Sequence, residues 1–307
     1  MKLTHPHVRH LYWSITSQTL AYVAGTHAFS IEQSQGFDAW FTALDEQPQP
    51  LERFIAEREH RLLGSYFEVL WQFFLTHFPD WSLLGSRIQV PPTGPTQGEL
   101  DIVAQSPSGD PLHIELAVKF YLRPTQRSGT AEADWLGPQT RDRLDLKLSK
   151  LADKQFPFFR DPAAQATLAQ AGLPLSALPT SVIKGYLFEP GQTGPNSQVA
   201  GALPDSVNPQ VHMGYWYHHN RIQPLLDHHD HWAIIDKWQW LGPYQHHTKP
   251  LDAQQVATFV EQHFQRPNYA LMLVQLAPED EHPGAAVWIE QQRFMLVEAG
   301  WPHLNPA

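Results

Sequence analysis

The amino-acid sequence predicts an α/β protein, and three observations support this class. An apolar stripe with helical spacing runs from about residue 51 to 77. Two segments rich in Ile, Val and Leu follow at 98–105 and 112–122, on either side of a turn. After residue 210 the pattern is mainly that of strands, with one helical segment at 252–264. Helices and strands therefore occur together in one chain.

The first element is an N-terminal helical segment at residues 1–50, which is followed by a longer helix. Pro48 and Pro50 end the segment and stand just ahead of the next helix, which we expect from about Leu51 to His77. On a helical wheel this helix has a wide apolar face and a narrow polar remainder that contains Glu68. Glu68 is therefore expected at the border between the core and a cavity, although a solvated surface glutamate is an equally open interpretation.

The next element is a β-hairpin. Residues 107–110, Pro-Ser-Gly-Asp, favour a turn between two apolar strands. In such a hairpin Asp101 lies opposite the segment from Glu115 to Ala117, so Asp101 and Glu115 are neighbours across the strands. Lys119 lies on the same face of its strand as Glu115, because side chains alternate along a strand.

A second helix is expected from Gly137 to about Phe156. Four basic side chains gather on one side of it: Arg143, Lys147, Lys150 and Lys154. Residues 119–154 contain eight of the 21 basic residues against five acidic ones. This part of the chain is locally basic, although charged helix faces are usually just solvated.

The rest of the chain gives a strand at 182–188, a Gly- and Pro-rich loop or linker at 189–210 and a β-rich C-terminal portion at 211–307. We therefore expect a core at 51–188 with the C-terminal portion packed on it. Six of the 11 tryptophans lie after residue 210, where core packing is a commoner use than base stacking. Several of the 18 histidines are clustered, but only His229 and His231 have same-face spacing, so surface histidines in polar loops explain most of them.

Composition restricts the chemistry. With no cysteine among 307 residues there is no disulfide, no thiolate zinc site and no cysteine nucleophile. A bound metal must use oxygen or imidazole ligands, so a hard, oxygen-bound cation is the first to consider. No apolar stretch is long enough for a membrane span, and the pattern is that of a cytoplasmic protein. The formal charge of −10 argues against indiscriminate coating of nucleic acid but leaves room for a local basic patch.

Two or three carboxylates that converge with one lysine indicate a metal-assisted site. Carboxylate oxygens bind Mg²⁺ or Mn²⁺ and leave positions for water and a phosphate oxygen. An ammonium group orients the attacking water or stabilises developing charge. The alternative is a structural ion pair between Glu115 and Lys119, which is costly to desolvate on an apolar strand.

At these residues the sequence resembles the PD-(D/E)XK nuclease superfamily. Glu68 resembles the helix acid that precedes the core, Asp101 in GELD resembles the motif aspartate, and IELAVK resembles the strand that ends in the motif lysine, Lys119. The order GSYFE, GELD, ELAVKFYL and LGPQTRDRLDLKL resembles an uncharacterised bacterial family, number eighteen fifty-three in the domain-of-unknown-function series. The resemblance implies a restriction-endonuclease-like core, with a central mixed β-sheet flanked by helices.

The chain departs from the superfamily pattern at two positions. Leu100 replaces a proline before Asp101, which is a common variation. Ala117 stands two residues before Lys119, where the pattern usually has an acid. Glu115 lies on the same face but about 6.6 Å farther along the strand, at about 3.3 Å per residue. Either the glutamate has moved and Glu68 helps to complete the site, or the site has lost catalysis and kept binding.

The resemblance implies a metal-dependent nuclease that hydrolyses phosphodiester bonds of DNA or structured nucleic acid with Mg²⁺ or Mn²⁺. Asp101 and Glu115 would ligate the metal, Glu68 would do so directly or through water, and Lys119 would assist the nucleophilic water. The basic helix face would follow the phosphates. One rival is an inactive module that binds nucleic acid or a protein partner. Another is a structural or partner-binding protein whose polar strand pair only stabilises the core.

Overall fold

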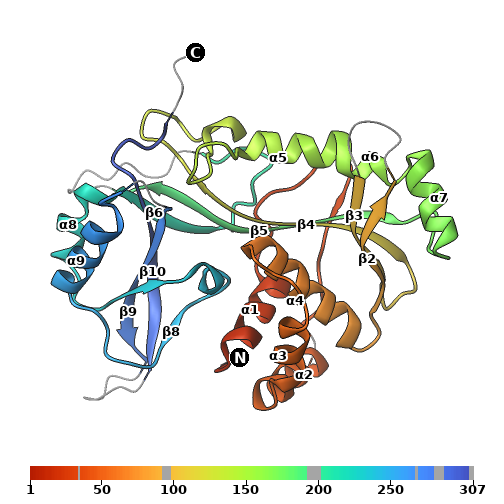
Figure 1. The fold of residues 1–307 in the computed structure, drawn as a ribbon, viewed down its shortest axis with the longest axis horizontal. Coiled ribbons are helices and arrows are strands. Elements are labelled where there is room, and N and C mark those ends of the chain that lie inside the picture. Colours follow the sequence, from red (N-terminus) through yellow and green to blue (C-terminus); the bar gives the residue numbers. More distant parts are fainter. Residues whose placement is uncertain (34, 92–97, 192–201, 267–268, 280–286, 304–307) are drawn as a thin grey trace. The chain divides into compact units, whose positions relative to one another are not determined.

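The computed structural model describes residues 1–33, 35–91, 98–191, 202–266, 269–279 and 287–303, and it has the α/β class that the sequence predicts (Figure 1). Its α-helices are α1 (Pro6–Thr16), α2 (Gln35–Glu46), α3 (Gln49–Ala56), α4 (Leu63–His77), α5 (Leu144–Lys150), α6 (Phe156–Phe158), α7 (Pro162–Gln170), α8 (Gln223–Leu226) and α9 (Ala253–His263). Within these ranges no helix is long and apolar enough to cross a membrane.

The strands form a ten-stranded mixed sheet. They are β1 (His27–Ala28), β2 (Ser82–Val90), β3 (Gly98–Gln105), β4 (Pro111–Leu122), β5 (Leu178–Pro190), β6 (His212–His218), β7 (Trp232–Ile235), β8 (Gln245–His246), β9 (Leu271–Pro278) and β10 (Trp288–Val297). Their order is β2-β3-β4-β5-β6-β10-β9-β7, with β1 beside β5 and β8 beside β10. Antiparallel pairs occur at β2–β3 and β3–β4, and parallel pairs at β5–β6 and β6–β10, so the central mixed sheet is confirmed.

The chain divides into two compact units, each assembled from separate stretches. Unit 1 contains residues 1–118, 146–184 and 206–208, and unit 2 contains residues 119–145, 185–205 and 209–307. Strands β4 and β5 pass from one unit into the other. Most of the predicted loop at 189–210, residues 192–201, lies outside the described residues.

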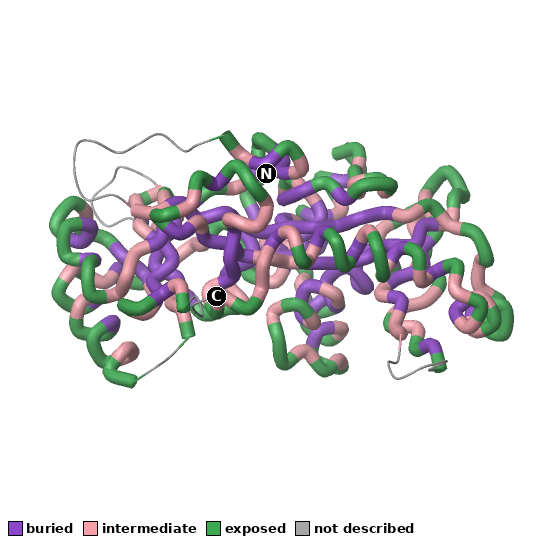
Figure 2. Tube along the Cα trace, turned by 90° about the horizontal axis from the view of Figure 1, so that it is seen from above, coloured by how far each residue is buried: buried purple, intermediate pink, exposed green. Residues whose placement is uncertain are grey.

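Unit 1 is a layered arrangement of helices around the β2–β3–β4 hairpins. Helices α1 to α4 lie on one face of these strands, and α5 to α7 lie on the other (Figure 1). Helix α4 is almost fully buried because its apolar residues occupy most of its circumference, as in Phe67, Leu70, Trp71 and Phe74. Long runs of buried residues occur along β4 and β5, and Figure 2 shows such runs beside coiled segments that alternate between buried and exposed positions.

The single helix predicted from Leu51 to His77 is wrong, because the structure divides it. Helix α3 ends at Ala56 and α4 begins at Leu63. The intervening residues 57–61, Glu-Arg-Glu-His-Arg, contain no apolar side chain that could hold another helical turn against the core. Helix α4 begins where apolar residues return to the sequence, so packing against the core determines its first residue.

The helix predicted from Gly137 begins seven residues later, at Leu144. Residues 137–142 form a loop instead, in which the Gly137 N–H donates to the Asp142 carbonyl at 2.8 Å and Thr140 has a φ of 67°. After α5 the chain forms a π-helical turn over Leu151–Gln155. Pro157 lacks an N–H and cannot donate to the Asp153 carbonyl, which favours an irregular turn at this point.

Unit 2 confirms the β-rich C-terminal portion with one longer helix. Helices α8 and α9 pack on β7, β9 and β10 around Trp232, Leu273 and Phe294. The tryptophans at 216, 232, 240 and 301 are buried, which agrees with core packing. Strand β7 ends at Ile235, because Asp236 and Gln239 form a capping box that starts a 3-10 turn over Lys237–Trp240.

Candidate functional site: a carboxylate cluster in unit 1

The hairpin register brings Asp101 and Glu115 together. Ile102 pairs with Ile114 and Val103 with His113, so one further step along the two strands aligns Asp101 with Glu115. At this step the Asp101 carboxylate accepts a hydrogen bond from the Leu116 N–H, with Oδ2 at 2.9 Å from the nitrogen. The cross-strand placement predicted from the turn is therefore confirmed.

Glu68 completes a cluster of three carboxyl groups. It projects from α4, is half-buried and lies close enough to Asp101 that the charge of Asp101 raises its pKa. Burial is the larger cause, and together they raise the pKa of Glu68 to about 7. The helix and the two strands thus contribute one acid each, and all three acids belong to unit 1. We call Glu68, Asp101 and Glu115 the carboxylate cluster.

Burial also dominates the electrostatics of the other two acids. It raises the pKa of Asp101 to about 7, with a further contribution from the charge of Glu115 and opposition from the Leu116 N–H. It raises the pKa of Glu115 to about 7, opposed by the positive charge of Lys147 and by hydrogen bonding to Asp101. Ionising these three carboxyl groups in the folded protein therefore costs free energy, because burial disfavours their charged forms.

Glu115 is held by two neighbours that the sequence analysis did not assign to the site. Its Oε1 lies 3.0 Å from the His113 Nε2, and its Oε2 accepts a hydrogen bond from the Gln155 side-chain amide. Burial lowers the pKa of His113 to about 4, so at pH 7 this contact is a hydrogen bond between a neutral imidazole and the Glu115 carboxyl group. Strand alternation places His113 on the face of Glu115, but the π-helical turn that carries Gln155 leaves no simple sequence signal.

The positive charges of Arg87 and Lys147 lower the pKa of Glu68, and those of Lys147 and Lys150 lower the pKa of Glu115. Lys147 also lowers the pKa of Asp101, and its Nζ donates to the Gln155 Oε1 at 3.3 Å. Lys119 belongs to unit 2, where its Nζ lies 2.5 Å from the Asp142 Oδ2. The Tyr121 hydroxyl donates to the other oxygen of Asp142 at 3.3 Å. The predicted motif lysine is therefore engaged by a carboxylate outside the cluster.

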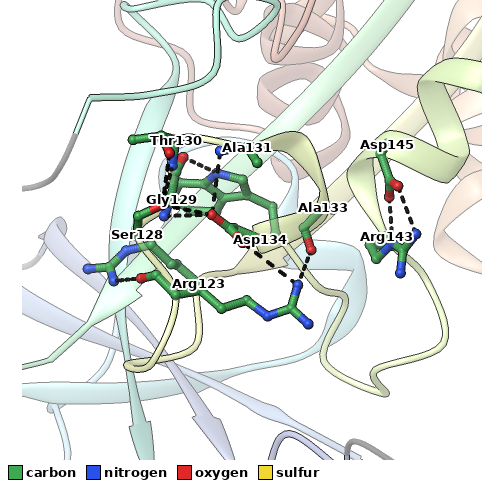
Figure 3. A network of polar contacts seen from close by, with 11 residues as sticks. Arg123, Ser128, Gly129, Thr130, Ala131, Ala133, Asp134, Arg143 and Asp145 are labelled. Carbon is green, nitrogen blue, oxygen red and sulfur yellow. Dashed lines mark hydrogen bonds and ion pairs between the residues drawn. The ribbon is translucent and has the colours of Figure 1, made fainter. Parts of the chain in front are cut away.

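The four basic residues predicted on one helix face have different environments. Arg143 precedes α5 and forms two hydrogen bonds with Asp145, from Nε at 2.6 Å and from Nη2 at 2.8 Å (Figure 3). The same view shows the neighbouring loop, where Asp134 accepts from the Gly129 N–H at 3.0 Å and from the Ser128 hydroxyl at 3.1 Å. Lys147 is half-buried at the cluster, whereas Lys150 and Lys154 are exposed.

The raised pKa of Asp101 predicts how stability depends on pH. The folded protein keeps this proton up to about pH 7, whereas the unfolded chain releases it near the ordinary value of 3.8. Unfolding therefore releases protons between these values, and the free energy of unfolding falls as pH rises through that window. An asparagine side chain cannot ionise, so we expect Asp101→Asn to melt at a higher temperature than the wild type, by about 2 °C or more at pH 8.

This difference should grow steadily from pH 4.5 to pH 7.5 in thermal melts recorded without divalent cations. His113, whose pKa is lowered by burial, has the opposite pH dependence and is present in both proteins. Asp110→Asn, at the turn of the same hairpin, controls for the substitution itself. A melting difference that stays constant over this range is incompatible with a buried, proton-holding Asp101.

The fold and the candidate site define an α/β protein whose mixed sheet has half-buried Asp101 and buried Glu115 on its β3–β4 hairpin, with half-buried Glu68 on helix α4. The chain belongs to the family described as Domain of unknown function (DUF1853), whose model matches residues 9–297. Comparison with curated proteins and with solved structures found no match. None of these comparisons links the family to the PD-(D/E)XK superfamily.

Proposed function

We propose that this protein is a metal-dependent nuclease that hydrolyses phosphodiester bonds of DNA or structured nucleic acid at the carboxylate cluster. The observation that carries the proposal is the placement of Asp101 and Glu115 across the β3–β4 hairpin, where the Asp101 Oδ2 accepts from the Leu116 N–H at 2.9 Å. Gln155 links Glu115 to the ammonium of Lys147, and Glu68 on α4 is the third acid of the proposed site. The resemblance of GELD and IELAVK to the PD-(D/E)XK pattern supports the same reaction.

The donor chemistry suits a hard divalent cation. Within the described ranges, no group of three His, Asp or Glu side chains is already arranged to hold a metal ion. Mg²⁺, however, is commonly bound by one or two carboxylates, with water and substrate phosphate as the other ligands. Asp101 and Glu68 fit that requirement, and Glu115 can contribute if it exchanges its bonds to His113 and Gln155. Bound Mg²⁺ or Mn²⁺ would supply Lewis-acid stabilisation of the phosphate and a more acidic water.

The residues of the chain would position the reactants. Asp101 and Glu68 hold the cation, and Glu115 supports Asp101 across the hairpin. An oxygen of water forms a bond to phosphorus, the P–O ester bond breaks, the leaving oxygen takes up a proton, and the attacking water gives one to solvent. The exposed Lys150 and Lys154 would bind phosphates beside the site, since contacts of this kind fix the register of the nucleic acid. Arg143 is less available because it is paired with Asp145.

Incubation of the purified protein with single-stranded DNA, duplex DNA, branched DNA and RNA tests the proposal. We expect strand cleavage with Mg²⁺ or Mn²⁺ and none with excess EDTA, because the carboxylates alone cannot neutralise the charge that develops on the phosphate. Cleavage that persists in EDTA would indicate a contaminating or metal-independent nuclease and would contradict the proposed site.

The second candidate is a module that binds nucleic acid without cleaving it. It is favoured by Ala117 at the usual acid position and by the two hydrogen bonds that occupy the oxygens of Glu115. It predicts intact substrates in the same assay and an affinity that falls with salt. The double variant Lys150→Glu, Lys154→Glu should then bind at least tenfold more weakly, with a smaller salt dependence. An affinity for nucleic acid that changes neither with salt nor with the Lys150→Glu, Lys154→Glu substitutions would exclude this binding function.

A further inference from the structure

We propose that Lys147, held by Gln155, is the lysine of the carboxylate cluster, in the role that the strand pattern assigns to Lys119. Its ammonium group would contact the scissile phosphate and neutralise the charge that develops on it. This inference rests on the proposed nuclease function and identifies a residue of that same site. It assigns the lysine to a helix on one side of the sheet, instead of to the strand that carries Glu115.

The π-helical turn is what brings Lys147 and Gln155 together. In a regular α-helix, two residues eight positions apart project about 80° apart, at 3.6 residues per turn. The wider turn at Leu151–Gln155 advances fewer degrees per residue and returns Gln155 toward the side of Lys147. The Nζ of Lys147 consequently donates to the Gln155 Oε1 at 3.3 Å. Wide turns of this kind are frequent at functional sites.

Gln155 connects the lysine to the cluster in a defined orientation. Its amide nitrogen donates to the Glu115 Oε2, and its amide oxygen accepts from Lys147. An ammonium group can only donate and an ionised carboxylate can only accept, so the two contacts together orient the amide. Gln155 is thus a positioning residue that holds an ammonium group near Glu115. An ammonium has three N–H groups, so the contact with Gln155 is compatible with donation to a phosphate oxygen.

The environment of Lys119 is different. Its ammonium is 2.5 Å from Asp142, and Tyr121 fills the second oxygen of that carboxylate. Lys119 must break this ion pair before it can bind a phosphate. Lys147 contacts the amide oxygen of Gln155, and the amide nitrogen of Gln155 donates to Glu115.

Cleavage kinetics of a labelled DNA substrate with Mg²⁺ test the assignment. We expect Lys147→Gln to lower kcat at least 100-fold while the affinity for the uncleaved oligonucleotide, measured in EDTA, changes less than threefold. Lys147→Arg keeps the charge and should recover activity to within tenfold of the wild type. Lys119→Gln should keep at least a tenth of the wild-type kcat, and Lys249→Gln, at an exposed position in unit 2, controls for loss of one surface charge.

A double-mutant cycle places the lysine independently of activity. At pH 8 without metal, Lys147→Gln should lower the melting temperature, and at least half of that loss should disappear in an Asp101→Asn background, because the two charges interact. The loss from Lys119→Gln and the gain from Asp101→Asn should simply add.

These experiments distinguish failure of the Lys147 assignment from failure of the proposed nuclease function. Wild-type kcat in Lys147→Gln, together with a 100-fold loss in Lys119→Gln, overturns the inference and leaves the proposed function intact. No cleavage by the wild-type protein overturns the proposed function and with it the catalytic role of Lys147. In that case the double-mutant cycle still tests the position of Lys147. Additive changes in melting temperature for Lys147→Gln and Asp101→Asn would place Lys147 outside the cluster, whereas non-additive changes would support its position there.

Discussion

Asp101→Asn should reduce metal-dependent cleavage at least 100-fold without unfolding the protein. Asparagine keeps an oxygen that can accept the hydrogen bond from the Leu116 N–H, which lies 2.9 Å from the Asp101 Oδ2 in the wild type. It removes the charge that would bind the cation and that raises the pKa of Glu68. Losing one preorganised electrostatic group typically lowers a rate by about 10²–10³. Cleavage, melting temperature and oligonucleotide affinity in EDTA should all be measured on the same preparation.

Asp110→Asn is the matched control for this variant. Asp110 lies in the turn of the same hairpin, is exposed and accepts a hydrogen bond from the Ser108 hydroxyl at 2.6 Å. We expect its cleavage rate to stay within about threefold of the wild type. If Asp101→Asn keeps more than a tenth of the wild-type rate, the carboxylate cluster is not the active site. A proportional loss of folding and cleavage would instead point to a structural role for Asp101.

Gly185→Ala should produce the largest loss of stability among single small substitutions on the central strands. Gly185 lies on β5 with a φ of 144°, and an added Cβ would stand 1.7 Å from the carbonyl oxygen of Lys119 on β4. Both the backbone conformation and the close approach exclude a side chain unless a strand moves. We expect destabilisation of about 3 kcal/mol or more. For a protein of this size, that corresponds to a drop of about 6 °C or more in melting temperature.

Gly64→Ala is the corresponding control, since a Cβ at that position in α4 has no heavy atom within 4 Å. Alanine there should leave stability unchanged or raise it by about 0.5–1 kcal/mol, because glycine loses more conformational freedom on folding. Thermal melts and urea titrations of the two variants check both expectations. A melting temperature of Gly185→Ala within 2 °C of the wild type would show that the strands can separate locally at little cost.

Local patterns were sufficient for the hairpin and for three members of the site. The Pro-Ser-Gly-Asp turn sets the register, and alternation along the strands then places Asp101 across from Glu115. The apolar stripe of α4 leaves Glu68 at the border of the core. Each of these predictions depends on residues within one hairpin or one helix, where geometry repeats from residue to residue.

Helix limits were less predictable because they depend on what the chain packs against. Residues 57–61 include helix-forming side chains but no apolar residue, and α3 and α4 separate there. The loop before Leu144 likewise replaces a helix that the spacing of apolar residues favoured. Propensity is a weak signal, and packing of an apolar face usually decides the outcome.

The sequence by itself determined the α/β class, the β3–β4 hairpin and the placement of Asp101 across from the segment that begins at Glu115, because periodicity and turn chemistry act over a few residues. Only the tertiary structure decided which side chains contact Glu115 and Lys119. That choice depends on contacts between segments far apart in the chain: Lys147 reaches Glu115 through Gln155 across a π-helical turn, while Lys119 is engaged by Asp142. Strand alternation places Lys119 on the correct face, but it contains no information about the partner that a distant loop supplies.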